Sequence, residues 1–177
     1  MTTEQPGSSS ALLVFSIGPV QDFIATARRT QDLWMGSYIL SYLAAAAMQE
    51  IACIPGSAPE QYDLDRILFP TLDGQPLIKK LWLNEPMTDE DLCKLALATL
   101  PNRFTAFVDA GHGAELARAA ENKVLEAWDK LAHRIADKFP KGIAETVTKA
   151  WQDLWKEQAD PHRWIEMYWV VCPYDAS

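Results

Sequence analysis

The sequence has few cysteines and no excess of positive charge. Cys53, Cys93 and Cys172 are odd in number and widely spaced, so neither a disulfide framework nor a zinc site is indicated. The 16 Lys and Arg residues are outnumbered by 24 Asp and Glu residues, which gives a net charge of −8. Because nonspecific affinity for nucleic acids comes from cations that neutralise phosphates, we expect contact with RNA only indirectly, through partners.

Long hydrophobic runs are also absent. The longest apolar stretch, Ile39 to Met48, contains Ser41 and is too short to span a bilayer. Residues 1–10 lack the basic and hydrophobic regions of a signal peptide and are expected to be a disordered leader. The sequence therefore predicts a cytoplasmic protein without a membrane partner.

What the chain does have is enough apolar material for one core. Of its 177 residues 49% are hydrophobic and 10% aromatic, which are values of a globular domain. We expect residues 11–177 to form a single domain. His112, His133 and His162 have no second ligand at metal-binding spacing, so they predict no metal site.

The first half of the chain predicts a strand followed by a long helix. Residues 11–17 read as a short buried strand that Gly18-Pro19 ends. From Pro19 to about Cys53 apolar residues recur near a helical period. The second half of this helix is apolar on all sides, so it should lie between a sheet and a second layer, which a partner could provide.

The middle of the chain predicts two further strands separated by an insertion. Residues 66–69 and 104–109 read as strands, the second of them central because its pattern alternates little. Residues 71–101 form the insertion, in which Thr88 is a candidate N-cap of a short helix that ends near Leu100.

The last third predicts two helices, about 114–139 and 144–158, and a strand at 164–172. The whole order is typical of an α+β, ferredoxin-like (βαββαβ) domain with an inserted helical segment and an extra helix before the last strand. A short α/β domain with both sheet faces covered is the competing prediction.

Several segments resemble one family. They are FSIGPVQDFI at 15–24, LWMGSYILS at 33–41, LFP at 68–70, PNRF at 101–104 and YWVVCP at 168–173. In sequence and order they are similar to the first palm (cyclase-like) domain of the large subunit of type III-B (Cmr) CRISPR effector complexes.

The resemblance implies an antiviral function. In that family two facing palm domains join ATP molecules into cyclic oligoadenylates, with Mg²⁺, when the guide RNA pairs with a target RNA. This chain would then supply one wall of a composite ATP site and contact the second palm and the other subunits of the complex.

Two departures from the family imply that this half is catalytically silent. The Gly-Gly-Asp-Asp motif belongs to the second palm and is absent here, and the first strand carries Ser16 where active palms carry a metal-binding Asp. No carboxylate pair is placed to hold two Mg²⁺ ions. We therefore predict no catalytic residues in this chain, and no nuclease domain before the first strand.

Four residues are candidates for contact with a nucleotide. Gly18 and Pro19 stand at a strand-to-helix junction, where free N–H groups can face an anion, although an ordinary tight turn explains them as well. Gln21 could meet a phosphate or ribose, or could be solvated. The resemblance places Ser37 near the adenine of ATP, whereas helix packing is the alternative, and packing is our prediction for Ser41.

Three arginines have two interpretations each. Arg28 and Arg29 could face the partner palm or a phosphate, but salt bridges to Asp22 or Asp32 are favoured. Arg103 has the same alternatives, with the cap of a neighbouring loop favoured.

Two rival functions stay open. The first is an interaction module that holds the complex together without touching a nucleotide; the seven tryptophans, which we expect in the core and at subunit interfaces, favour it. The second is a free-standing ferredoxin-like regulatory domain that binds a small ligand.

Overall fold

The computed structural model describes residues 10–25, 27–58, 60–138 and 145–174. The predicted leader, residues 1–10, lies outside this part except for Ser10, which already belongs to a strand. The elements are β1 (Ser10–Gly18), α1 (Val20–Ala25), α2 (Thr30–Ala52), η1 (Leu64–Arg66), β2 (Ile67–Phe69), α3 (Pro76–Ile78), η2 (Lys79–Leu83), α4 (Asp89–Leu95), β3 (Arg103–Asp109), α5 (Gly113–Ala136), α6 (Glu145–Gln158), η3 (Pro161–Arg163) and β4 (Glu166–Pro173).

The four strands form one antiparallel sheet in the order β2-β3-β1-β4. This is the order of a ferredoxin-like βαββαβ domain, so the predicted fold class is confirmed. Strand β3 is central, as predicted, but its burial alternates along the chain. The alternation arises because only one face of the sheet is covered, which also excludes the competing prediction of two covered faces within the described residues.

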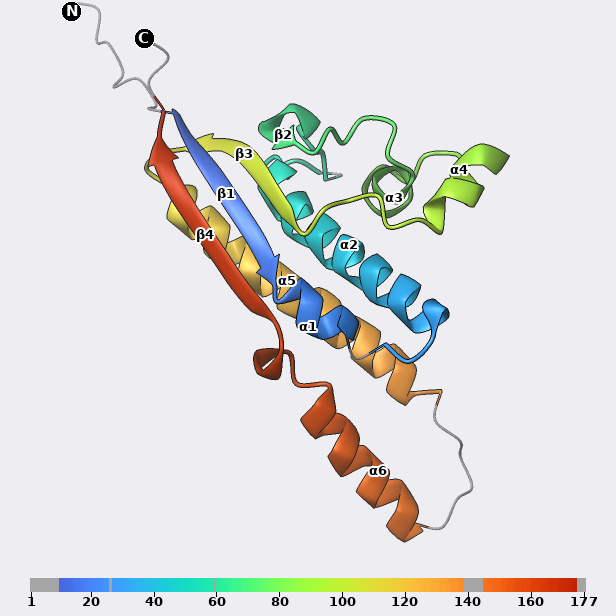
Figure 1. Cartoon of the computed structure of the whole chain (residues 1–177). Coiled ribbons are helices and arrows are strands. Elements are labelled where there is room, and N and C mark those ends of the chain that lie inside the picture. Colours follow the sequence, from blue (N-terminus) through green and yellow to red (C-terminus); the bar gives the residue numbers. More distant parts are fainter. Residues whose placement is uncertain (1–9, 26, 59, 139–144, 175–177) are drawn as a thin grey trace, which may run out of the picture.

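Helices α2 and α5 cover one face of the sheet and pack against each other (Figure 1). The side chains that point toward them from the two central strands are buried, and Phe15 stacks on Phe104 with ring centroids 5.2 Å apart. Lys123 and Glu50 form an ion pair at 3.9 Å between the two helices. The indole of Trp169 donates to Glu121 across 3.0 Å and ties β4 to α5. The core therefore lies between this face and the two helices.

The start of α5 approaches the sheet very closely at Gly113. A Cβ atom placed on Gly113 would lie 2.8 Å from Cγ1 of Val171 and 3.1 Å from Cγ2 of Val108. No larger side chain fits there without movement of these valines, so the glycine sets how near the helix lies to the sheet.

The predicted long helix from Pro19 to Cys53 is wrong in one respect, because the chain divides it into α1 and α2. Arg29 has an extended backbone (φ −132°, ψ 155°) and acts as the N-cap of α2. Its N–H donates to Oδ2 of Asp32 across 3.1 Å. A carboxylate three residues after the cap accepts an N–H group that would otherwise lack a partner. Its negative charge also interacts favourably with the positive end of the helix. A new helix therefore starts here.

The insertion, 71–101, contains two more helical elements than predicted. Besides α4, it forms α3 and the π-helical turn η2, which ends at Asn84 in a left-handed conformation (φ 49°). Thr88 is confirmed as the N-cap of α4, since its Oγ1 accepts the N–H of Asp91 across 3.1 Å. The helix ends at Leu95, earlier than the predicted Leu100.

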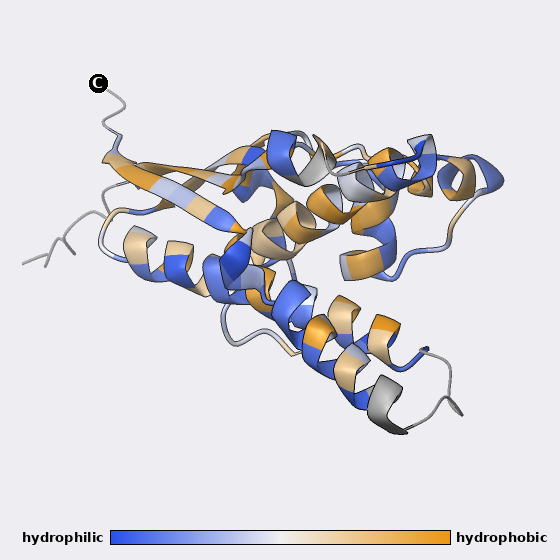
Figure 2. Cartoon of the chain, turned by 60° about the horizontal axis from the view of Figure 1, so that its bottom comes forward, coloured by the Kyte–Doolittle hydropathy of each residue, from blue (hydrophilic) through white to orange (hydrophobic). Residues whose placement is uncertain are grey.

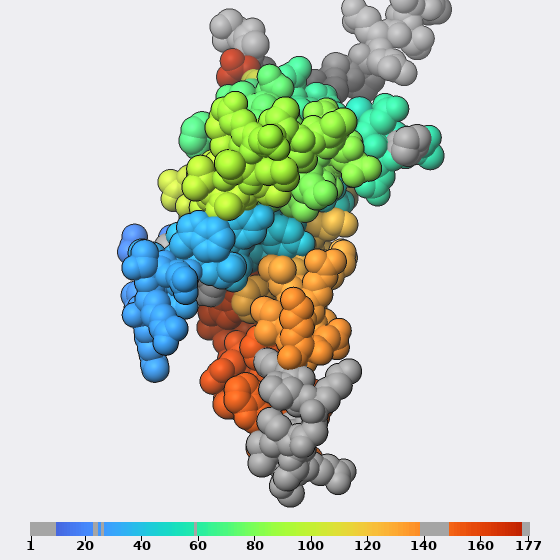
Figure 3. All heavy atoms as spheres, turned by 90° about the vertical axis from the view of Figure 1, so that its right-hand side faces the viewer, coloured from blue at the N-terminus to red at the C-terminus, as the bar shows by residue number. Residues whose placement is uncertain are grey.

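The insertion also provides part of the second layer that the apolar half of α2 requires. Leu77, Ile78 and Trp82 are buried, and α3 packs against α2. Figure 3 shows the insertion, in green, lying directly over α2. The chain itself therefore covers this part of the helix, where the sequence had left room for a partner.

Helix α6 extends away from the rest of the molecule (Figure 1). Its surface mixes apolar and polar segments (Figure 2), and Trp151 and Leu154 are 53% and 48% exposed. Near the end of α5, Ile135 is also 46% exposed. None of the described helices combines the length and apolarity needed to cross a membrane.

Candidate functional site

The predicted site begins where β1 ends. Gly18 closes β1 and Pro19 leads into α1, and both are half-buried. The helix that follows has six residues, so it aligns far fewer peptide dipoles than the long helix predicted from the sequence. Gln21 is exposed on α1. The attraction of the helix end for an anion is therefore weaker than the sequence indicates.

Ser37 lies in α2, which packs against α1. Because α2 starts at Thr30, Ser37 is two turns into its helix and not five turns into a continuous one. Its Oγ donates to the carbonyl oxygen of Leu33 across 3.1 Å. This bond stays within one helical turn. The hydroxyl could therefore bond to a ligand without breaking a contact between distant parts of the chain.

Ser41 differs from Ser37 although both lie on one helix. Ser41 is 1% exposed, and its Oγ donates to the carbonyl oxygen of Leu100 across 2.6 Å. The bond fastens the end of the insertion to α2, so the predicted packing role of Ser41 is confirmed.

The uncovered face of the sheet is apolar along most of its length. Leu12 lies between Phe107 and Cys172 in the strand register, and Val14 lies between Thr105 and Val170. Phe107 and Val170 are 36% and 56% exposed. No described element covers this face, so it is open to a ligand or to another domain.

A polar row crosses the open face at the end near Gly18, and sequence reasoning missed it. Ser16 pairs with Arg103 of β3 on one side and with Tyr168 of β4 on the other. Side chains directly opposite each other on one face of an antiparallel sheet have Cβ atoms about 5 Å apart. Asn102 fixes this end, because its Nδ2 donates to the carbonyl oxygen of Ile17 across 2.7 Å.

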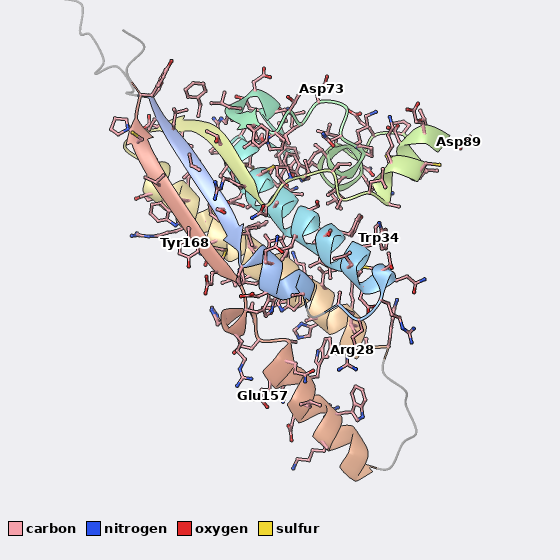
Figure 4. All side chains as sticks on the ribbon, viewed as in Figure 1. Arg28, Trp34, Asp73, Asp89, Glu157 and Tyr168 are labelled. Carbon is pink, nitrogen blue, oxygen red and sulfur yellow. The ribbon has the colours of Figure 1, made fainter. Side chains whose placement is uncertain are left out.

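The two ends of the row differ in charge, because Arg103 is a cation and Tyr168 is neutral. Tyr168 is 63% exposed, and its hydroxyl donates to Oε2 of Glu166 across 2.7 Å. This hydrogen bond, together with the negative charge of Glu166, raises the pKa of Tyr168. The phenol therefore stays neutral, and its ring lies on the surface of β4 (Figure 4).

Arg103 is exposed, and within the described residues its guanidinium makes no hydrogen bond or ion pair. The favoured interpretation as a loop cap is thus wrong. The favoured salt bridges of Arg28 and Arg29 are also missing from the described part of the chain, since Asp32 accepts the backbone N–H of Arg29 and not its side chain. Arg28 is exposed between α1 and α2 (Figure 4).

The row suits an anion better than a metal ion. Ser16 stands at the strand position where the family resemblance led us to look for a metal-binding Asp, and across the described ranges no three His, Cys, Asp or Glu residues are grouped to hold a metal. A guanidinium with a neighbouring hydroxyl instead offers hydrogen-bond donors for phosphate oxygens.

An apolar patch surrounds the start of α2. Leu33, Trp34 and Met35 are 43%, 42% and 46% exposed, and Trp34 stacks on Tyr38 with centroids 5.9 Å apart. Burial, and to a smaller extent the charge of Tyr42, raises the pKa of Tyr38. Consecutive residues point about 100° apart on a helix, so these side chains surround the first turns of α2 and leave apolar surface there for a partner.

Comparisons with known proteins agree with the resemblance found in the sequence. Residues 12–133 match the family described as the N-terminal region of the CRISPR-associated protein Cmr2. The chain is also 31% identical over 126 residues to the CRISPR system Cmr subunit Cmr2 of Pyrococcus furiosus. That alignment covers 71% of this chain but 13% of the relative, so the chain spans only a small part of the relative's length.

Proposed function

Since the chain belongs to the Cmr2 N-terminal family, we propose that it is a palm half of a type III-B CRISPR large subunit and forms one wall of a composite ATP site. The second palm of the subunit would provide the opposite wall and hold the Mg²⁺ ions. In this way the chain contributes to cyclic oligoadenylate synthesis and hence to antiviral defence, while carrying no catalytic residue itself.

One observation carries the proposal: the only uncovered sheet face among the described residues ends in polar side chains beside Gly18. Ser16 and Arg103 lie in one row there, and Gly18, Pro19 and Gln21 follow directly along the chain. The apolar remainder of the face can pack against another domain, while its polar end meets a nucleotide held between the two.

The chemistry expected of this half is binding and orientation. Ser37 has a hydroxyl bonded only to its own helix, so it can turn toward an adenine at little cost. Its helix, α2, packs against α1, the element that also carries Gln21. Bound ATP with Mg²⁺ would supply the nucleotidyl group, and these side chains would hold it in place.

The test is a calorimetric titration of ATP with Mg²⁺ into this chain alone, into the separately expressed second palm, and into their mixture. We expect tighter binding in the mixture than in either part, and we expect Ser37→Ala to weaken it by roughly 2- to 10-fold, the value of one neutral hydrogen bond. If the mixture binds no better than the second palm alone, the chain is only a scaffold.

A second function is favoured by the exposed patch of Leu33, Trp34 and Met35. In this alternative the chain is an interaction module that contacts other subunits of the effector complex and touches no nucleotide. Guide and target RNA would be met only through those subunits, in keeping with the net charge of −8. Trp34→Ala should then prevent assembly with the other subunits and leave ATP binding unchanged, whereas Ser37→Ala should affect neither.

A further inference from the structure

We propose that Arg103 is the side chain of this domain that binds the phosphates of the nucleotide, with the Ser16 hydroxyl beside it. The inference rests on the proposed nucleotide site and assigns one of its contacts. It comes from the position of Arg103 in the sheet.

Arg103 is the only Lys or Arg in the four described strands. Its strand neighbours on the covered side, Phe104 and Ala106, are fully buried, so alternation places Arg103 on the open face. Arg103 is exposed, and its guanidinium has no partner within the described residues, so its hydrogen-bond donors are available to an anionic ligand.

The surroundings hold Arg103 in place without using its charge. Asn102, its neighbour, pairs with Ile17 twice, by Nδ2 to the Ile17 carbonyl oxygen at 2.7 Å and by its own carbonyl oxygen to the Ile17 N–H at 2.9 Å. Within the described residues no carboxylate bonds to the guanidinium. Glu166, two residues before Tyr168 on β4, accepts the hydroxyl of Tyr168 and lies two strands away from Arg103.

Phosphate is the anion that fits best. A guanidinium binds phosphate oxygens through two parallel N–H bonds, and a serine hydroxyl directly opposite can donate a third. Arg103 and Tyr168 lie on the two strands that flank β1, so their backbones are about 10 Å apart. A nucleoside triphosphate is long enough to extend from the guanidinium across Ser16.

The test compares Arg103→Gln with Arg118→Gln, which removes the same charge from an exposed position of α5, on the opposite side of the sheet. ATP, AMP and adenosine are titrated into the wild type and both variants, each alone and mixed with the second palm. Thermal unfolding of each variant checks that it is folded.

We expect Arg103→Gln to weaken ATP binding roughly 10- to 100-fold, the range for a charged hydrogen-bond pair. The loss should be smaller for AMP and less than about 2-fold for adenosine, while Arg118→Gln behaves as the wild type. Arg103→Lys should recover part of the loss, because it keeps the charge but not the bidentate geometry.

Two results would overturn the assignment while leaving the nucleotide site standing: Arg103→Gln binds ATP as well as Arg118→Gln does, or it loses adenosine as much as ATP. If the wild-type chain binds no ATP alone and its mixture with the second palm binds ATP no more tightly than the second palm does, the proposed function itself is wrong. The assignment of Arg103 is then wrong as well.

Discussion

The two faces of the sheet are made by the same strands but differ in chemistry. Toward the helices, Leu13, Phe15 and Phe104 are completely buried. On the other face, Val170 and Tyr168 are 56% and 63% exposed, and the single cation of the strands lies there. One face therefore stabilises the fold, whereas the other is available for binding. Substitutions on the two faces should therefore affect different properties.

The largest difference in stability is expected between substitutions of two adjacent residues of β1. Phe15→Ala removes a fully buried ring and should lower the free energy of unfolding by about 3–5 kcal/mol. Val14→Ala, one residue away on the open face, should lower it by less than about 1 kcal/mol. Urea unfolding of both variants measures this. Equal losses would mean that the open face is also part of the core.

The next largest loss of stability should come from a substitution at the point where α5 lies closest to the covered face of the sheet. Gly113→Ala places a Cβ within 2.8 Å of Val171 and should destabilise the fold by about 1–3 kcal/mol. Gly18→Ala is the matched control, because a Cβ there meets nothing within 4 Å. A Gly113→Ala protein as stable as the Gly18→Ala protein would show that the helix can move away from the sheet.

The two serines of α2 give a smaller contrast. Ser41→Ala leaves the carbonyl oxygen of Leu100 without its 2.6 Å donor and should cost about 1–2 kcal/mol of stability. Ser37→Ala should stay within about 0.5 kcal/mol, since its bond lies within one helical turn. If Ser37→Ala destabilises the fold as much as Ser41→Ala does, Ser37 contributes to packing. Weaker ATP binding by the Ser37→Ala variant could then not be attributed to a lost contact with the nucleotide.

The smallest expected effect is a loss of stability at acidic pH, caused by Asp91 in the insertion. Hydrogen bonds from the backbone and side chain of Thr88, and then Lys79, hold the pKa of Asp91 below its ordinary value. Because the folded pKa is lowered, the stabilisation is complete above the unfolded pKa, about 4, and is lost as the pH falls through the folded value. Thermal unfolding between pH 6 and 2.5 should show it.

Asp91→Asn is the control for this pH effect. The variant should have a flatter stability curve below pH 4 than the wild type, while the ion pair of Lys94 with Glu90 on the same helix is unchanged. Parallel curves for the two proteins would exclude Asp91 as the responsible group.

Strands and long helices could be predicted from the sequence because their signals are local. Apolar runs ended by Gly18-Pro19 and Pro70 placed two strand ends, and the fold class followed from the order. The break between α1 and α2 was missed because neither glycine nor proline stands between Val20 and Ala52 except Gly36. The available signal was Asp32, whose carboxylate caps Arg29.

The polar row could not be predicted from local patterns. Ser16, Arg103 and Tyr168 come from three distant parts of the chain, and only the register of β1 with β3 and β4 brings them together. Likewise, an apolar helix such as α2 does not reveal whether its second layer comes from a partner or, as here in part, from the chain's own insertion. Both depend on pairing between distant segments.

The most direct test of separate roles for the two faces is an NMR titration of the isotope-labelled chain with ATP and Mg²⁺, in the presence of the unlabelled second palm. The account predicts that amide shifts change at Ser16, Gly18, Arg103 and Tyr168 and along the open face, while the outer surface of α5 and the insertion stay unchanged. Shifts confined to α6 or the insertion, or no shift at the end of β1, would contradict it.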